Sequence, residues 1–359
     1  MLHIENRLKK LREKMIQKNL DAVLVTKREN YFYLSGFTGT SANLIITKDE
    51  ALLVTDFRYV EQAEKQSPDF QVIKYSGTLS DFVSNILLDR NIKTLGFEEM
   101  AIPFGRLMEY KEKLGNMELV PLNGILENLR IIKDQEEINT IKKAVEIADN
   151  AYAYILKFIK PGMAEIEVAA EIEYFMRKQG AASASFDIIV ASGKRAAMPH
   201  GVASEKKLEF GDVVTLDYGA LYKGYCSDIT RTFFLGKADE ELRNIYSIVL
   251  EAQQKSLEKA AKGMKGSEVD YIARDIITKA GYGENFGHGL GHGVGLEIHE
   301  EPRFSPYAGN TEMENGMVVT VEPGIYITGL GGVRIEDMIV INDNSPIVLT
   351  GATKEMIIL

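Results

Sequence analysis

Hydrophobic and polar positions alternate in short segments over the first 125 residues. A helical pattern covers about residues 4–19, and the apolar segment 22–26 follows it as a strand. The same reading predicts further strands and helices, namely strands at 42–49, 51–56, 70–75 and 93–97 and helices from 59, over 79–89 and near 104–114. This alternation predicts a small α/β domain with helices over a mixed sheet.

A long amphipathic helix opens the second part of the chain, after the pattern breaks near Pro121–Gly124. Asp134 is a good N-cap residue, and Glu137 three residues later completes a capping box. Apolar residues then keep helical spacing at Ile138, Ile141, Ala144, Val145 and Ala148. We therefore predict two domains, 1–125 and 126–359.

The second part contains an internal repeat. The pairs GM and EV occur in this order within 162–168 and again within 263–269, at an offset of 101 residues. Further on, GDVVTLD at 211–217 recurs as GMVVTVE at 316–322, at an offset of 105 residues. Each half then reads helix, helix, β-hairpin. We expect a twofold-like arrangement in which the two hairpins meet in the middle.

Each repeat places two carboxylates on its hairpin. Asp217 and Asp228 lie almost symmetrically about the tight turn at 222–224, and Glu322 and Glu336 take the corresponding places in the second repeat. Taken alone, each acid is an ordinary exposed strand residue. Four acids at the centre of a buried sheet would repel one another unless they were protonated or neutralised by cations. Two divalent metal ions sharing these carboxylates would neutralise them.

Three of the five histidines lie in the segment GHGLGHGVGLEIH, namely His288, His292 and His299. The spacing of the first two suggests a zinc-binding helix, but the alternate glycines at 287–295 would each cost up to about 1 kcal/mol in a helix. In an extended strand residues 288 and 292 share a face, so both rings can point into one cleft. The glycines would then let a substrate backbone approach closely.

Three other residues bear on this candidate site. His200 lies in a PHG segment before the first hairpin, where we expect a fixed loop at the edge of the cleft; a surface-loop histidine is the alternative. Arg334, two residues before Glu336, would be the cation that balances the acids. Cys226 shares a strand face with Asp228 and is interpreted as a small core residue.

Composition narrows the class of protein. The chain has 359 residues, 45% of them hydrophobic and 26% charged, which suits a globular protein of two domains. The net charge of −10, without clustered Lys and Arg, argues against a nucleic-acid partner. No apolar run approaches the roughly 20 residues that span a bilayer. Residues 1–20 read as a surface helix rather than a signal peptide, and the single Cys226 cannot form an internal disulfide, so we expect a cytoplasmic protein.

Together these motifs resemble those of the pita-bread superfamily of methionine aminopeptidase, aminopeptidase P and prolidase. The resemblance lies in DYG with a second Asp eleven residues on, in GHGLGHGVGLEIHE, in TVEPGIY and in VRIED. NYFYLSGFTG and TDFRY resemble the amino domain of the Xaa-Pro peptidase branch, which methionine aminopeptidases generally lack. The resemblance extends over the whole chain. It implies an α+β protein with an internally duplicated pita-bread catalytic domain and a smaller N-terminal α/β domain.

By this resemblance, five residues hold two divalent metal ions: Asp217, Asp228, His292, Glu322 and Glu336. Asp228 and Glu336 would bridge the two ions. Asp217 would complete one ion, and His292 with Glu322 the other. Because four carboxylates and one imidazole favour hard ions, Mn²⁺ is our first choice, with Co²⁺ and Zn²⁺ as alternatives.

The resemblance also implies the chemistry, which is hydrolysis of the peptide bond before proline. A hydroxide bridging the metals would attack the scissile carbonyl, and Glu322 would carry a proton to the leaving proline nitrogen. His200, His288 and His299 match the substrate-binding and transition-state-stabilising histidines of the family. Arg334 matches its buried supporting arginine.

Two proline-directed reactions remain open. An aminopeptidase P removes the residue before proline from longer peptides, whereas a prolidase splits only Xaa-Pro dipeptides. We favour the aminopeptidase slightly and keep the dipeptidase as the alternative. Arg303, in HEEPRFSP, resembles an arginine that pairs with the dipeptide carboxylate in some prolidases, and a surface-loop arginine is the other interpretation. The family implies a homodimer in which Asp56, Arg58 and Tyr59 help to shape the partner's cleft, or form a structural ion pair instead.

Two further alternatives belong to other functional classes. A creatinase-like enzyme keeps the fold but hydrolyses a small guanidino compound without a metal. A catalytically inactive pita-bread module would only bind other proteins. Both predict that metal ligands have been lost, and all five are present in this sequence.

Overall fold

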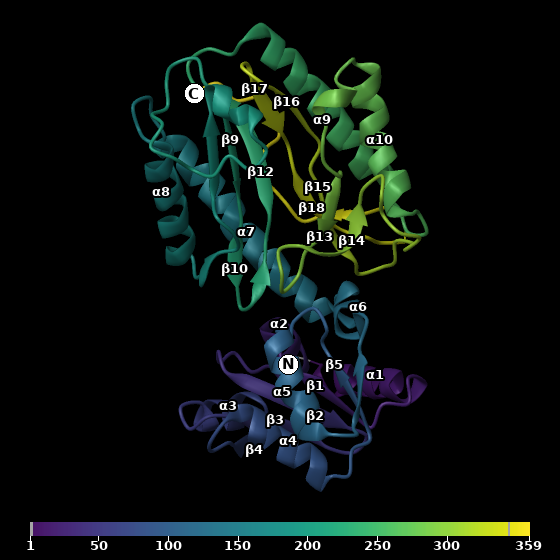
Figure 1. Cartoon of the computed structure of the whole chain (residues 1–359). Helices are drawn as coiled ribbons and strands as arrows, with labels where there is room; N and C mark the ends of the chain where they lie inside the picture. The colour runs from purple at the N-terminus through teal and green to yellow at the C-terminus, as the bar shows by residue number, and fades with distance from the viewer. Residues whose placement is uncertain (1–2, 344) are drawn as a thin grey trace. The chain divides into compact units, whose positions relative to one another are not determined.

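A computed structural model describes residues 3–343 and 345–359 of the chain. The chain divides into two compact units at Arg130 and Ile131, and each unit is described by itself (Figure 1). The boundary predicted at 125/126 falls at the start of α6 (Ile125–Ile131). No helix within the described residues is long and apolar enough to cross a membrane.

The N-terminal unit is built on a six-stranded mixed sheet in the order β4-β3-β2-β1-β5-β6. Its strands are β1 Ala22–Val25, β2 Ala42–Thr47, β3 Ala51–Thr55, β4 Gln71–Lys74, β5 Thr94–Phe97 and β6 Glu118–Pro121. Strands β1, β2 and β3 pair antiparallel, and the outer strands join them in parallel. The α/β alternation predicted for this part of the chain is thus confirmed.

Six helices accompany this sheet. They are α1 Ile4–Gln17, α2 Arg28–Ser35, α3 Val60–Gln66, α4 Leu79–Asp89, α5 Phe104–Leu114 and α6 Ile125–Ile131. In α1 the buried apolar residues are Ile4, Leu8, Leu11 and Met15, which line one face at helical spacing, and Arg7 is buried beside them. Helix α4 begins where Thr78 caps it by accepting the Asp81 N–H. Helix α2, helix α6 and strand β6 were not predicted from the sequence.

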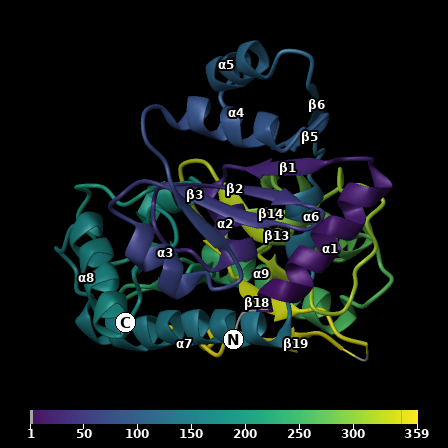
Figure 2. The same ribbon diagram turned by 90° about the horizontal axis from the view of Figure 1, so that it is seen from below.

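The C-terminal unit repeats one order of elements. Its first half has α7 Gln135–Phe158, α8 Glu165–Lys178, β7 Ser183–Ala184, β8 Ile189–Ser192, the 3₁₀ turn η1 Gly193–Ala197, β9 Val213–Tyr218, β10 Ala220–Tyr222, β11 Tyr225–Cys226 and β12 Ile229–Phe234. Helix α7 starts with the predicted Asp134–Glu137 capping box. Helix α8 runs beside α7 in both views of the ribbon (Figures 1 and 2), and the two share one hydrophobic core with β9 and β12.

The second half has two helices and a hairpin again. Its elements are α9 Glu240–Lys259, α10 Gly266–Lys279, η2 Gly283–Asn285, β13 Gly291–Gly293, β14 Glu300–Phe304, β15 Val318–Val321, β16 Gly324–Ile327, β17 Gly331–Arg334, β18 Asp337–Val340 and β19 Ile347–Val348. Figure 1 shows α9 and α10 on one side of the unit and α7 and α8 on the other, with β9, β12, β15 and β18 between them. The predicted helix–helix–hairpin duplication is confirmed.

The registers of the two hairpins bring the acidic positions together. In the first, Asp217 pairs with Thr230, and the turn at Lys223 and Gly224 has positive φ at both residues. In the second, Val321 pairs with Asp337 and Gly324 with Arg334, so Glu322 and Glu336 fall at facing positions. Each hairpin therefore presents two acids near the centre of the unit.

A buried ion pair ties the two halves together behind these acids. Arg231 Nη2 lies 2.7 Å from Asp337 Oδ1, and the two side chains are 1% and 0% exposed. Arg231 also donates to the carbonyl of Glu336 and, at 2.7 Å, to that of Ala352. Gln253 donates to the second Asp337 oxygen at 2.8 Å. The guanidinium thus fixes the main chain on which Glu336 stands.

Arg231→Met is expected to lower the free energy of unfolding by about 3–5 kcal/mol, because it removes the fully buried cation of Asp337 and leaves that carboxylate only its ion pair with the part-exposed Lys354. Urea unfolding measures the loss as a lower midpoint at unchanged slope. The matched control is Lys255→Met, which removes the ion pair of Lys255 with Glu258, whose side chains are 45% and 60% exposed. That change should cost less than about 1 kcal/mol. Equal losses in the two variants would contradict this account of Arg231.

Candidate active site

A cavity of about 550 Å³ lies in the C-terminal unit. Every site residue predicted in that unit lines it, namely His200, Asp217, Asp228, His288, His292, His299, Arg303, Glu322, Arg334 and Glu336. These residues come from both halves of the repeat. The duplicated hairpins therefore build one site.

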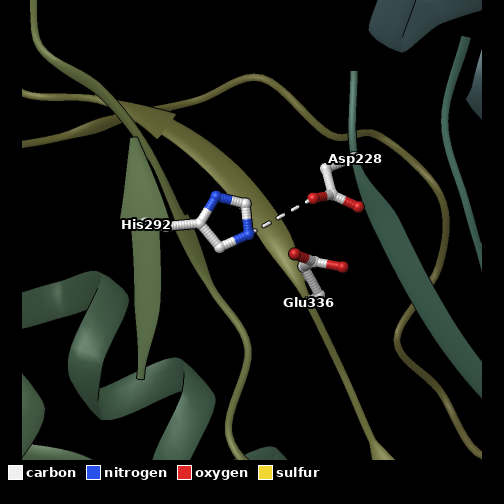
Figure 3. Close-up of side chains that lie close together, drawn as sticks. All are labelled: Asp228, His292 and Glu336. Carbon is white, nitrogen blue, oxygen red and sulfur yellow. Dashed lines mark ion pairs between the residues drawn. The ribbon is translucent and has the colours of Figure 1, made fainter. Parts of the chain in front are cut away.

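Three of these residues form the tightest group, shown in Figure 3. Ligand atoms of Asp228, His292 and Glu336 all lie within 4.8 Å of one another, and all three residues are buried. Asp228 precedes β12, His292 stands on β13, and Glu336 lies between β17 and β18. His292 Nε2 lies 3.5 Å from Asp228 Oδ2 and 3.3 Å from Glu322 Oε1.

The protonation state of His292 indicates that this group requires a cation or a further proton. Its Nδ1 lies 3.1 Å from the Gly293 carbonyl, which can only accept, so Nδ1 carries the proton. Burial, with the neighbouring His299, lowers the pKa of His292 to about 3, so the ring is neutral. Its Nε2 lone pair therefore faces the oxygens of Asp228 and Glu322. Acceptors that face one another require a cation or a proton between them.

Unpaired oxygens support the same conclusion. Asp217 Oδ1 and Glu336 Oε1 are buried and have no hydrogen-bond partner among the residues that the structure describes. The second oxygen of each carboxylate accepts a hydrogen bond. Arg334 donates to Asp217 Oδ2 at 2.6 Å, and Thr230 donates to Glu336 Oε2 at 2.8 Å. Buried carboxylate oxygens without donors are costly unless they bind a cation. The donor set thus fits divalent metal ions.

The acids of the group repel one another without such ions. Burial, together with the nearby carboxylates, raises the pKa of Asp228 and of Glu336 well above the ordinary values. Burial also raises the pKa of Glu322 to about 8. Bound cations would reverse these shifts by stabilising the ionised carboxylates.

Arg334 organises the side of the cavity beside Asp217. Besides its ion pair with Asp217, it donates to the Tyr326 hydroxyl at 2.8 Å and to the Pro199 carbonyl at 3.2 Å. His288 Nε2 lies 2.9 Å from the same hydroxyl, and its Nδ1 lies 2.7 Å from the Gly289 carbonyl. Since that carbonyl accepts a hydrogen bond from Nδ1–H, Nε2 has no proton and the Tyr326 hydroxyl donates to it. Burial lowers the pKa of His288 to about 4, so this ring is neutral as well.

Two residues of this network were missed from the sequence. Tyr326 faces Gly332 across the β16–β17 pair, close to Arg334, and the predicted hairpin register was the signal that would have placed it there. Thr320 accepts the His292 N–H at 3.0 Å and donates to Glu322 Oε1 at 3.2 Å. Thr320 belongs to the VVT segment that occurs in both repeats, so the repeat itself marked it.

The remaining predicted residues lie around the rim. His200 is exposed in the loop after η1, and His299 is exposed with its ring 4.3 Å from the His292 ring, edge to face. Burial on one side lowers the pKa of His299. Arg303 pairs with His292 across β13 and β14, and its side chain is 42% exposed.

The glycines around His292 have a different role from the one expected. A Cβ on Gly291 would lie 2.1 Å from the Thr320 carbonyl oxygen, and one on Gly293 would lie 2.3 Å from that of Glu301. The close approach at these two positions is therefore made by the protein's own neighbouring strands. The segment 287–295 contains no helix, as expected. Only Gly291–Gly293 forms a strand, however, and His288 lies before it.

Arg58 belongs to the N-terminal unit. It binds Asp56 through two hydrogen bonds of 2.8 and 2.9 Å, and these lower the pKa of Asp56 to about 2. This is the structural ion pair that the sequence analysis kept as the alternative. A role of Arg58 in substrate binding stays a prediction.

Three comparisons with known proteins bear on this geometry. Residues 139–343 match Metallopeptidase family M24, and residues 7–132 match the Creatinase/Prolidase N-terminal domain. A solved Xaa-Pro dipeptidase from Bacillus anthracis is 48% identical, with a TM-score of 0.97 over 99% of this chain and 100% of that one. The Xaa-Pro dipeptidase of Pyrococcus horikoshii is 44% identical over 99% of both chains. A solved X-Pro aminopeptidase from Thermotoga maritima is 38% identical, with a TM-score of 0.91 over 97% of this chain and all of that one.

Proposed function

Because this chain belongs to metallopeptidase family M24 and carries the Creatinase/Prolidase N-terminal domain, we propose that it splits Xaa-Pro dipeptides with two divalent metal ions. The predicted pita-bread resemblance is confirmed by these matches. The observation that carries the proposal is that four carboxylates line one cavity with the neutral His292, and that Asp228 and Glu322 lie 3.5 and 3.3 Å from its Nε2.

The choice of dipeptidase follows the relatives. Our preference from the sequence was the aminopeptidase, with the dipeptidase as the alternative. The relatives from Bacillus anthracis and Pyrococcus horikoshii are both named Xaa-Pro dipeptidase, at 48% and 44% identity. The relative named X-Pro aminopeptidase is more distant, at 38% identity. These names support the alternative.

The residues that would hold the two ions are Asp217, Asp228, His292, Glu322 and Glu336. When bound, divalent ions polarise the scissile carbonyl and make water a nucleophile at neutral pH. Four carboxylates and one imidazole suit Mn²⁺ among the common ions. The preference for Mn²⁺, the homodimer and the cytoplasmic location all stay predictions.

Glu322 is the residue we assign to proton transfer. Its Oε1 accepts from Thr320 at 3.2 Å and lies 3.3 Å from His292 Nε2, on the wall of the cavity. A carboxylate beside the reacting groups can take up a proton and release it again. Glu322 would take the proton of the attacking water and deliver it to the proline nitrogen, which must be protonated to leave.

The other three histidines of the cavity and Arg334 have the remaining roles. His200 and His299 are exposed on the cavity wall, and we assign them to the substrate and to the oxyanion that forms during attack. His288 holds the Tyr326 hydroxyl against Arg334 and presents its ring to the cavity. Arg334 in turn holds Asp217 in place through its ion pair.

Met-Pro and Met-Pro-Gly distinguish the two proline-directed reactions. We expect Mn²⁺-loaded enzyme to cleave Met-Pro, with kcat/KM at least about tenfold higher than for the tripeptide. Release of methionine measured by chromatography gives both rates. Cleavage of the tripeptide alone would restore the aminopeptidase, and cleavage of neither peptide would refute Xaa-Pro hydrolysis.

Arg303→Met is expected to raise KM for Met-Pro by about ten- to hundredfold, since a charged hydrogen bond contributes about 1.5–3 kcal/mol. The reason is that Arg303 lines the cavity with a side chain that is 42% exposed, and its ion pair with Glu301 is long, at 3.8 Å, and equally exposed, so the guanidinium can turn to the proline carboxylate. kcat should change little. Met-Pro-amide lacks the carboxylate and is the matched control. A loss of the same size on the amide would show that Arg303 does not read the carboxylate.

A further inference from the structure

Glu165 is a fully buried carboxylate in the first turn of α8, outside the cavity. Its Oε1 accepts from the Ser192 N–H at 2.9 Å and from the Ser192 hydroxyl at 2.8 Å. Its Oε2 accepts from the Ser204 N–H at 3.1 Å, from the Ser204 hydroxyl at 2.6 Å and from the Arg195 guanidinium. One carboxylate thus gathers donors that follow it in the sequence by 27 to 39 residues.

These donors stand at the two ends of the loop that carries His200. Ser192 ends β8, and Ser204 follows the loop, so Glu165 holds the loop at both ends. Arg195 closes it further by donating to the Val202 carbonyl at 2.9 Å. On the cavity side, Arg334 donates to the carbonyl of Pro199, the residue before His200. The position of the exposed His200 ring therefore depends on how firmly this loop is held.

The second half of the repeat shows that the fold itself does not require this carboxylate. At the same offset of 101 residues that relates the two GM segments, the counterpart of Glu165 is Gly266. A Cβ on Gly266 would lie 1.9 Å from the carbonyl oxygen of Arg303, so main chain fills that place. In both halves a helix starts at this position, α8 at Glu165 and α10 at Gly266. The start of α8 supports the loop of His200, whereas the start of α10 packs against the strand of Arg303.

We propose that Glu165 is a positioning residue for His200, which acts by fixing the loop 192–204 against α8. The five hydrogen bonds to its carboxylate hold the loop in the conformation that places His200 on the cavity wall. The catalytic consequence rests on the proposed function. The structural part, that Glu165 immobilises the loop, stands on its own.

Glu165→Gln tests the proposal with little change of shape. A glutamine has one acceptor oxygen and one NH₂ group, so in either orientation its NH₂ faces donors of Ser192 or of Ser204 and Arg195. We expect kcat for Met-Pro to fall by about ten- to hundredfold, as for a small misplacement of a catalytic group, while KM changes by less than about threefold. Bound metal, measured by elemental analysis, should stay at the parent value.

A double-mutant cycle with His200→Ala separates positioning from a general structural effect. If Glu165 acts through His200, adding Glu165→Gln to His200→Ala lowers kcat no further. Independent, multiplying losses would overturn the proposal. The matched control is Glu167→Gln on the same helix, since exposed Glu167 accepts only the Ala164 N–H of its own cap among the bonds described, at 2.7 Å. It should keep the parent kcat.

Hydrogen exchange of residues 192–204 in the metal-free protein supplies a readout that needs neither substrate nor metal. We expect at least about tenfold faster exchange of this segment in Glu165→Gln and parent-like exchange in Glu167→Gln. Unchanged exchange in folded Glu165→Gln would overturn the proposal. If that variant does not fold, Arg195→Met tests the same loop at its 26% exposed arginine, and Arg195→Lys should partly restore slow exchange. A parent that cleaves no Xaa-Pro peptide refutes the proposed function only.

Discussion

Asp228→Asn is expected to lower kcat for Met-Pro by roughly a thousandfold or more, because the ions that activate the water lose a charged ligand. Asp228 is buried, and its ligand atom lies within 4.8 Å of those of His292 and Glu336. Asparagine keeps the size of the side chain but offers one neutral oxygen. Steady-state rates and elemental analysis of the same samples measure the loss of activity and of bound metal.

The control for this variant lies two residues away. Cys226 is buried, is the single cysteine of the chain, and is expected from the sequence to be a small core residue. Cys226→Ala should therefore leave kcat within about threefold of the parent, with a modest loss of stability from the missing sulfur. An Asp228→Asn enzyme that retained both its metal and a tenth of the parent activity would contradict the assignment of this ligand.

The metal-free protein is expected to lose stability as pH rises from 6.5 to 8.5. In the folded metal-free state, burial and mutual repulsion raise the pKa of Asp228 and of Glu336 well above the ordinary values, and burial raises the pKa of Glu322 to about 8. The folded chain therefore binds more protons than the unfolded chain in this range, so unfolding becomes easier as protons are removed. The lowered pKa values of His288 and His292 act only below about 6.5, where unfolded histidines become charged.

Bound metal reverses this behaviour because the ions stabilise the ionised carboxylates. The difference in Tm between Mn²⁺-loaded and EDTA-treated protein should widen by roughly 4–8 °C between pH 6.5 and 8.5. Calorimetry at three pH values measures it. Glu322→Gln should flatten the metal-free curve over this range. Parallel curves for the two forms, or a metal-free Tm that rises with pH, would contradict the pKa shifts.

The sequence predicted the acidic centre because its information is local. The turn and the strand pattern of each hairpin determine its register. The facing positions of Glu322 and Glu336 could therefore be predicted without any tertiary contact. The internal repeat then related this hairpin to that of Asp217 and Asp228. In a twofold-like fold the two hairpins meet, so their four acids come together in one site.

Helix α2 was not predicted, because its conformation depends on tertiary contacts rather than on local pattern. Its sequence, RENYFYLS, is rich in aromatic residues, which favour strands when they are read locally. In the fold Asn30 is buried with Tyr33 and Leu34, three and four residues further on, and the helix ends at Gly36 with φ of +74°. Tertiary burial decided between two local conformations.

The supporting residues of the site could not be predicted for a related reason. Lys133 forms a buried ion pair with Glu300, the neighbour of His299, at 3.0 Å and across 167 positions in the sequence. Glu165 likewise supports a loop that follows it by 27 to 39 residues. No periodicity along one segment shows which distant donor will meet a given carboxylate. The proposed ligands were visible in motifs, whereas supporting contacts between distant segments, such as those of Lys133 and Glu165, appear only in three dimensions.

The proposed ligands are divided between the two halves of the duplicated unit, with Asp217 and Asp228 in the first and His292, Glu322 and Glu336 in the second. Neither half alone holds a complete set. If the unit arose by fusion of two copies of a half-length chain, a dyad between such copies would already have brought four acids together. A histidine in one half only would then mark a position at which the two copies have diverged.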